Sequence, residues 1–232
     1  ICLVVDSGYK YVSNTCSGFV SVKDDTLTIT NVTKDLNCTV EFGKETFKID
    51  LDQSNATIQS QPNKIYLVYS QGWYKDVTGL TTINKLDQNP KRTGYTFGGY
   101  QTTNADGKNV QVIDSNGNVK TKDGTDELST LSLFNGPGTL YAKWTANKYT
   151  VTLNANGATS AGTTSVSATY GSAMPAITKP TRAGYTFGGY YTSTGGSGTQ
   201  YYTAAGASAR AMAIAGNTTL YAKWTANKYT VT

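Results

Sequence analysis

Few side chains in this chain could perform chemistry, and none of its 232 residues is histidine. Without histidine the chain lacks the commonest general base, the Ser-His and Cys-His nucleophile pairs and the HExxH type of metal site. Paired carboxylates could still hydrolyse glycosides. The candidate acids are Asp24 with Asp25, and Asp123 with Asp126 and Glu127. Both groups lie in polar, turn-like sequence, so we interpret them as solvated loop acids and expect no enzymatic activity.

Two further segments resemble ligand-binding loops only in part. Residues 114–118 (DSNGN) carry calcium-type oxygen ligands, but the glycine comes too early and no glutamate occupies the twelfth position. We therefore predict an Asn-Gly hairpin there. Residues 195–198 (GGSG) fit no phosphate-binding motif and indicate a flexible loop tip. Because CxxC spacing and histidine are both missing, we expect neither a metal site nor a cofactor.

The net charge of +5 comes from basic residues that are scattered along the chain. The densest basic clusters are Lys91 with Arg92, and Lys120 with Lys122. These clusters are too small to follow a phosphate backbone, so we expect a solvated surface and no nucleic-acid partner.

The elements that must position these side chains come in copies. The stretch LYAKWTANKYTVT occurs at residues 140–152 and again at 220–232, and GYTFGGY occurs at 94–100 and 184–190. Self-similarity of this kind means that one supersecondary unit has been copied in series. The fold must therefore be interpreted one repeat at a time.

Aligning the copies predicts the organisation of the chain. Residues 44–146 form repeat 1, residues 147–226 form repeat 2, and residues 227–232 are the first strand of a further repeat. Residues 1–43 are the back half of a divergent repeat, with SGYKY at 7–11 in place of GYTF and CTVEF at 38–42 in place of LYAKW. Repeat 1 has two insertions, between Tyr69 and Pro90 and between Gln111 and Leu140, which we expect to be surface loops. Because the chain begins and ends inside a unit, we expect it to be a segment of a longer polypeptide.

The periodicity predicts a mainly β protein. Residues 140–144 and 149–153 alternate as half-buried strands do, and 64–69, 165–170 and 95–97 are rich in β-branched and aromatic residues. Asn-Gly and Asp-Gly pairs at 116, 156, 106 and 123 indicate turns. The Gly-Gly pairs at 98–99 and 188–189 indicate bulges or close backbone approach. The alanine-rich segment 204–215 permits at most one short helix per repeat.

The paired GYTF and LYAKW motifs resemble the Listeria/Bacteroides repeat, the B-repeat of internalin-type bacterial surface proteins. The resemblance covers both full repeats, and residues 1–42 look like a divergent relative. It implies small β-grasp-like domains in series, each with a mostly antiparallel sheet against a short helix or loop segment, in secreted, modular bacterial proteins. The family usually has Gly-Trp-Tyr after the GYTF strand, whereas this chain has Gly99-Tyr100 and Gly189-Tyr190 after another glycine. The resemblance therefore does not specify the core packing at that position.

All three cysteines lie within the first 38 residues. Cys16 follows the SGYKY strand and Cys38 lies on the strand equivalent to LYAKW, so we expect a disulfide between these neighbouring elements. Cys2 would then pair with an absent part of that repeat or remain a free thiol. The alternative is that all three cysteines are buried and unpaired.

The composition points to small aromatic cores. The chain contains seventeen tyrosines and three tryptophans. Each such side chain buries a large area and keeps a polar edge, so aromatic packing should supply much of the stabilisation of two or three small domains.

These observations favour a non-enzymatic spacer or stalk at a bacterial surface, cell-wall-attached or secreted, that projects or supports an adhesive domain. Its partners would be the neighbouring repeats of the same chain, without membrane insertion in this segment. In one alternative, the module adheres to a host-surface protein or glycan through exposed aromatic residues, and in another it associates with copies of itself into a fibre. Each aromatic residue could instead pack in a core or across strands. The candidate contacts are Trp73, Tyr74, Tyr191, Tyr201 and Tyr202.

Overall fold

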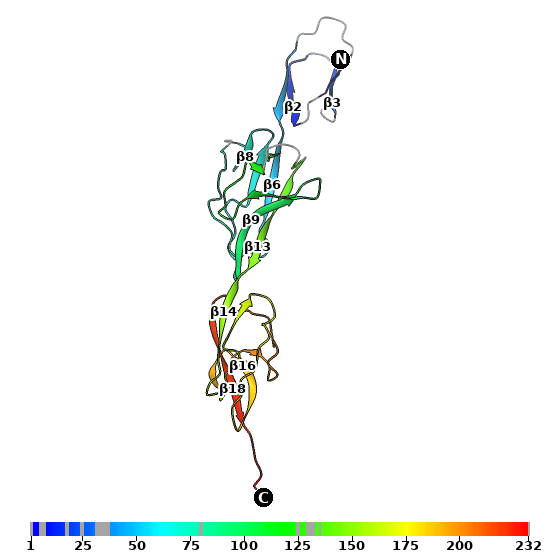
Figure 1. Ribbon diagram of the computed structural model, residues 1–232. Helices are drawn as coiled ribbons and strands as arrows, with labels where there is room; N and C mark the ends of the chain where they lie inside the picture. Colours follow the sequence, from blue (N-terminus) through cyan, green and yellow to red (C-terminus); the bar gives the residue numbers. More distant parts are fainter. Residues whose placement is uncertain are drawn as a thin grey trace. The chain divides into compact units, whose positions relative to one another are not determined.

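The computed structural model describes residues 2–4, 8–16, 19–23, 26–30, 38–78, 81–123, 126–128, 133–134 and 136–231. The chain separates into two compact units (Figure 1). Unit 1 contains Ile1–Lys91 and Phe97–Lys143, and unit 2 contains Arg92–Thr96 and Trp144–Thr232.

Unit 2 is built on one five-stranded sheet in the order β15-β14-β18-β16-β17. The two central strands, β14 and β18, run parallel with Leu153 opposite Leu220, and the outer pairs are antiparallel. The strands are β14 (Lys148–Asn154), β15 (Ser165–Thr169), β16 (Tyr185–Tyr191), β17 (Gln200–Tyr202) and β18 (Thr218–Ala226).

Unit 1 contains a six-stranded sheet in the order β10-β9-β13-β6-β7-β8. Its central pair, β6 and β13, is also parallel, and Leu51 lies opposite Leu140. The order therefore repeats that of unit 2, with β8 added outside β7. The strands are β6 (Thr46–Asp52), β7 (Lys64–Val68), β8 (Gly72–Tyr74), β9 (Tyr95–Thr103), β10 (Asn109–Ile113) and β13 (Gly138–Ala146), with a separate two-stranded ribbon of β11 (Lys122–Asp123) and β12 (Asp126–Glu127).

The first part of unit 1 pairs β2 (Tyr9–Asn14) with β5 (Val40–Lys44). Tyr11 lies opposite Phe42, as Phe187 lies opposite Trp224 in unit 2, and each pair precedes a register shift. The two segments thus share this register, and the assignment of residues 1–43 as the back half of a divergent repeat stays a prediction. A separate sheet in the order β1-β4-β3 completes this part, from β1 (Cys2–Val4), β4 (Thr26–Thr30) and β3 (Phe19–Lys23).

A disulfide joins Cys16 to Cys38, with their Cα atoms 4.7 Å apart. This is the pairing that the sequence predicts. The backbone N–H of Thr15 donates to the carbonyl of Thr39 beside it, so the bridge closes the open end of the β2–β5 pair. The side chain of Cys2 lies outside the described residues.

The predicted strands of both repeats are confirmed, but the alanine-rich segment 204–215 forms no helix. It runs as a loop that is tied down by bridges between Tyr202 and Ser208 and between Ala173 and Ala211. Gly206 adopts a positive φ of 82° in this loop, which interrupts any helical turn. Among the described residues, helical structure is limited to one 3₁₀ turn, Thr194–Gly196. The described chain is thus all-β.

The Gly-Gly pairs form the predicted close approach of two backbones. Gly99 and Gly189 have φ of 102° and 111°. A Cβ atom at Gly189 would lie 2.2 Å from the carbonyl oxygen of Tyr202, and one at Gly99 would lie 2.2 Å from the carbonyl oxygen of Ile113. The residue pairing shifts between Phe187 and Tyr190, which is a β-bulge. No side chain has room at Gly99 or Gly189.

The bulge also places aromatic rings in the core. It brings Phe187 and Tyr190 to one face, with ring centroids 5.3 Å apart and planes inclined at 67°, and Phe97 and Tyr100 form the same edge-to-face pair at 5.2 Å. The core of unit 2 consists of Val151, Leu153, Ala168, Met174, Phe187, Tyr190, Tyr201, Tyr202, Met212, Leu220 and Ala222.

The prediction that both insertions of repeat 1 are surface loops is wrong in part. The first insertion forms β8 and buries Ile83 and Leu86, and the second buries Leu128 and Phe134. The rings of Trp73 and Phe134 meet edge to face at 6.4 Å, so the two insertions pack against one another. They enlarge the core of unit 1.

Candidate functional site

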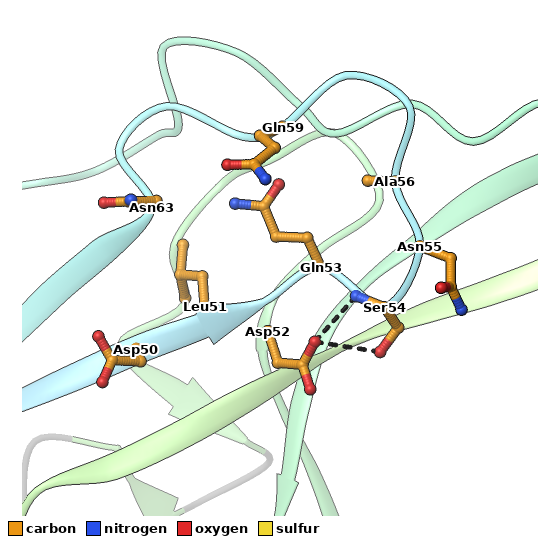
Figure 2. A pocket seen from close by; sticks show the side chains of 9 residues that line it. All are labelled: Asp50, Leu51, Asp52, Gln53, Ser54, Asn55, Ala56, Gln59 and Asn63. Atoms are coloured by element: carbon orange, nitrogen blue, oxygen red, sulfur yellow. Dashed lines mark hydrogen bonds between the residues drawn. The ribbon is translucent and has the colours of Figure 1, made fainter.

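A polar hollow of about 470 Å³ lies in unit 1 where β6 ends. Figure 2 shows the end of this strand and the loop after it, with the side chains of Gln53 and Gln59 inside the bend. The lining residues are Asp50, Leu51, Asp52, Gln53, Ser54, Asn55, Ala56, Gln59 and Asn63. The hollow contains no aromatic side chain, so it lacks the stacking surface that a sugar ring would use.

Four of the side chains that line this hollow are bound to other groups of the chain. The Asp52 carboxylate accepts hydrogen bonds from the backbone N–H and the hydroxyl of Ser54, at 2.8 and 3.2 Å (Figure 2). The Asp50 carboxylate lies 2.9 Å from the ammonium of Lys48. The buried Gln53 side chain accepts the backbone N–H of Ser60 at 2.5 Å. These bonds hold the loop in place.

The same turn occurs in unit 2 with different chemistry. Asn154 replaces Asp52, and its side-chain oxygen accepts the backbone N–H of Asn156 at 2.9 Å. The N–H donors of the two turns, Ser54 and Asn156, both adopt positive φ, at 33° and 49°. Since an amide serves as well as a carboxylate, the role shared by both copies is to fix an Asx turn after the first strand.

The structure describes only some of the acids named from the sequence. Asp24 and Asp25 lie outside the described residues. The backbone of Asp123 lies opposite that of Asp126 in the β11–β12 ribbon, and the exposed Glu127 makes a 2.7 Å ion pair with Lys122. The ribbon therefore shows cross-strand charge pairing at a surface.

Residues 114–118 form the predicted Asn-Gly hairpin. The Asp114 carboxylate accepts the backbone N–H groups of Asn116 and Asn118, at 2.8 and 2.9 Å, and the Asn118 amide at 2.9 Å. Partial desolvation works to raise the pKa of Asp114, but these hydrogen bonds and the charge of Lys120 outweigh it and lower that pKa. The carboxylate acts as the acceptor of the turn.

The aromatic residues named as candidate ligand contacts are mostly in the cores. Trp73, Tyr74, Tyr201 and Tyr202 are buried, with 4%, 9%, 3% and 0% of their surface exposed. Tyr191 is half-buried, and the ammonium of Lys223 lies 5.7 Å from its ring centroid. They form no contiguous exposed patch, so the structure gives them packing roles, and their binding of a ligand stays an untested prediction.

The most perturbed titratable groups are core tyrosines. Burial raises the pKa of Tyr100, Tyr190 and Tyr202 to about 12 each. The hydroxyl of Tyr100 lies 3.1 Å from that of Ser60, and the hydroxyl of Tyr202 donates to the Pro175 carbonyl at 2.9 Å. A pKa shift in this direction favours the neutral phenol, as packing requires, and it disfavours a phenolate base.

Sequence reasoning missed the hollow and the hydrogen bond between the hydroxyls of Tyr100 and Ser60. The available signal was the polar run after β6, which contains Asp52, Ser54 and Asn55 before an extended segment. Such a run predicts a turn, and in the structure these polar residues form that turn.

Within the part of the chain that the structure describes, no group of three or more Cys, Asp or Glu side chains is placed to hold a metal ion. Across the same residues, no helix has the length and apolar character needed to cross a membrane.

The two units define a protein of serially repeated β modules. Residues 149–223, which make up most of unit 2, match the model of the Listeria-Bacteroides repeat domain. This segment is a repeat of that family, as its GYTF and LYAKW motifs suggest.

Two relatives extend the comparison. Over 149 residues, 64% of the chain, it is 32% identical to internalin H of Listeria monocytogenes. Over 92 residues, 40% of the chain, it is 36% identical to a protein of Evansella cellulosilytica described as a Gly-rich membrane protein. The matches span only 22% and 10% of these relatives. No solved structure matches the chain.

Proposed function

We propose that this chain is a non-enzymatic spacer of a bacterial surface protein, secreted or attached to the cell wall, that supports an adhesive domain. The observation that carries this proposal is the use of aromatic side chains inside the cores. Trp73, Tyr201 and Tyr202, which could bind a partner if exposed, are at most 4% exposed. A module whose large side chains are used in this way contributes length and stiffness more readily than a binding surface.

The topology supports small β-grasp-like repeats as the unit of the spacer. In unit 2 the first and last strands, β14 and β18, are the parallel central pair, and β15 and β16 lie outside them in antiparallel pairs. A β-grasp domain would place a helix between its second and third strands. Here the loop between β15 and β16 fills that role, with Met174 buried and Ile177 packed against the core.

The relatives and the disulfide support a location outside the cell. One relative is an internalin and another is described as a membrane protein. The Cys16–Cys38 bridge is typical of proteins from oxidising compartments.

Small-angle X-ray scattering of the full chain tests the spacer role. A compact globule of 232 residues has a radius of gyration of about 17 Å. Modules that act as a spacer should give a clearly larger radius that does not change between dilute and concentrated samples. A radius near that of the globule would refute the proposal. A glycan array and a pull-down with host extracts, run on the same sample, test the adhesion alternative.

Self-association is a second candidate function, favoured by the edge of the sheet in unit 2. β15 forms this edge, whereas its counterpart β7 in unit 1 is covered by β8. An open strand edge can pair with another chain. Light scattering of the full chain, compared with a Ser167→Pro variant in the middle of β15, tests this idea. A monomeric wild type at high concentration would exclude it.

A further inference from the structure

The dipeptide Gly-Tyr occurs at the start of the β2, β9 and β16 strands, and the first copy is covered by a tyrosine ring. In unit 1 the ring of Tyr69 lies directly on Gly8, where a Cβ atom would be only 2.3 Å from the ring. The same ring meets Tyr9 edge to face, with centroids 5.9 Å apart. Gly8 is needed twice, for its φ of 88° and for this close approach.

The second copy, within unit 2, is covered in the same way. The ring of Tyr170 lies on Gly94, where a Cβ atom would be 2.4 Å away, and meets Tyr95 edge to face at 5.6 Å. The guanidinium of Arg92 lies 3.9 Å from the Tyr95 ring centroid. Tyr95 thus contacts a cation and an aromatic ring, and both contacts are favourable.

One residue ties each tyrosine to its glycine through the backbone. The N–H of Asn147 donates to the Gly94 carbonyl, and the Asn147 carbonyl accepts the N–H of Tyr170, both at 2.9 Å. Glu45 makes the same two bonds, to Gly8 at 2.9 Å and from Tyr69 at 3.0 Å. The covering tyrosine is therefore the residue that follows the second strand of a repeat, at the ends of β7 and β15.

The third copy, Gly184 with Tyr185, has the same scaffold without the covering ring. The N–H of Asn227 donates to the Gly184 carbonyl at 2.9 Å. The guanidinium of Arg182 lies 3.9 Å from the Tyr185 ring centroid, the distance that Arg92 keeps from Tyr95. Yet a Cβ atom at Gly184 would meet no atom of the described residues within 4 Å, and Tyr185 is 37% exposed.

We propose that Gly184 and Tyr185 form a docking surface for the tyrosine that follows the second strand of a further copy of this repeat. Three features would recognise the partner. Gly184 offers a surface without a side chain, Tyr185 offers the edge or face of an aromatic ring, and the Asn227 carbonyl can accept the tyrosine N–H. Both occupied copies in this chain hold that residue type on that surface. The inference rests on the proposed spacer role, because serial repeats would supply the partner.

The side-chain contacts of the linker favour the same occupant. The Thr186 hydroxyl donates to the Asn227 side-chain oxygen at 2.7 Å, as the Thr96 hydroxyl does to Asn147 at 2.6 Å. Asn227 therefore makes the same side-chain and N–H hydrogen bonds as Asn147, whose carbonyl accepts the tyrosine N–H. Compared with the Gly94 copy, the Gly184 copy lacks the covering tyrosine ring and the backbone N–H of that tyrosine.

The test uses the full chain and an extended chain in which a copy of residues 153–226 is appended after Thr232, continuing the repeat. Hydroxyl-radical footprinting with mass spectrometry measures the oxidation rate of Tyr185, and Tyr95 of the same molecule serves as the internal standard for a covered ring. In the extended chain the rate at Tyr185 should fall to that of Tyr95. A Tyr→Ala change at the appended copy of Tyr170 should restore the original rate, and Tyr→Phe there should keep Tyr185 protected.

Three outcomes would overturn the proposal. Tyr185 could keep its full oxidation rate while hydrogen exchange shows that the appended repeat is folded. The Tyr→Ala variant could protect Tyr185 as well as the wild-type copy does. Tyr185 could also become protected in the unextended chain as its concentration rises, which would identify a second molecule as the partner. An exposed Tyr185 in an elongated particle would reject the docking surface alone, whereas a protected Tyr185 in a compact particle would reject the spacer role alone.

Discussion

Removing the hydroxyl groups of the core tyrosines one at a time should distinguish those that are hydrogen-bonded from the one that is not. Tyr100, Tyr190 and Tyr202 are all fully buried. The hydroxyls of Tyr100 and Tyr202 have partners in Ser60 and Pro175, whereas that of Tyr190 has none among the described residues. Replacing tyrosine by phenylalanine removes the hydroxyl and keeps the ring that packs.

The expected energies have opposite signs. A neutral hydrogen bond contributes a net stabilisation of about 1 kcal/mol, so Tyr202→Phe should lower the free energy of unfolding of unit 2 by about that amount. An unpaired buried hydroxyl loses its hydration on folding, so Tyr190→Phe should leave the stability unchanged or raise it by about 1 kcal/mol. For a unit of this size, 1 kcal/mol corresponds to a Tm shift of about 4–8 °C.

Hydrogen exchange with mass spectrometry in increasing denaturant can assign the change to one unit. Peptides from β16 and β18 report on unit 2, and peptides from β6 and β13 report on unit 1 as the internal reference. Tyr202→Phe is the matched control because it changes the same unit in the same way. If Tyr190→Phe destabilised unit 2 as much as Tyr202→Phe does, the Tyr190 hydroxyl would have a partner and the reasoning would fail.

Three further results are expected. Gly189→Ala should destabilise unit 2 by about 2 kcal/mol or more in denaturant titrations, because the φ of Gly189 is positive and an added Cβ would meet the Tyr202 carbonyl. In the control Gly188→Ala, the added Cβ meets the flexible Lys223 side chain, so this change should cost far less. Cys16→Ser opens a loop with a sequence separation of 22 and should cost the β2–β5 region about 3 kcal/mol, seen as faster hydrogen exchange there and unchanged exchange in unit 2. Burial raises the pKa values of Tyr100, Tyr190 and Tyr202 to about 12, so their contribution to stability is fully present below the ordinary tyrosine pKa of about 10 and is lost as the pH rises to about 12. Between about pH 10 and 12, circular dichroism should therefore show unfolding together with a rise in tyrosinate absorbance. Tyrosinate formation in this window with the sheet signal intact would contradict that expectation.

Local features of the fold follow from the sequence because their causes are local. The alternation of Tyr149, Val151 and Leu153 predicts β14, since only a strand puts every second residue on one face. The Gly-Gly pair at 188–189 predicts the bulge, because positive φ and close backbone approach both exclude a Cβ atom. The alanine-rich segment 204–215 misleads because helix propensity is weak and bridges to neighbouring segments override it.

The burial of Trp73 could not be predicted, because the residue it packs on is distant in sequence and has no counterpart in the other repeat. Comparing the copies shows where repeat 1 has extra residues, but it does not show whether two insertions contact one another. Trp73 packs on Phe134, which lies in the second insertion, and both are buried. The hollow beside Asp52 was missed for a related reason, since the loop closes through Gln53 and Ser60, which a turn signal does not join.

The paired insertions also show how two copies of one module can differ at a sheet edge. In unit 1 the first insertion adds β8 outside β7, and the second insertion covers Trp73 of β8 with Phe134. Each insertion supplies one ring of this buried pair. Repeat 2 lacks both, so β15 remains the edge of its sheet. β15 is short, and Ser165 and Ser167 are exposed on it. The shorter repeat therefore keeps an open edge that could pair with another chain, whereas the longer repeat covers the equivalent strand with β8.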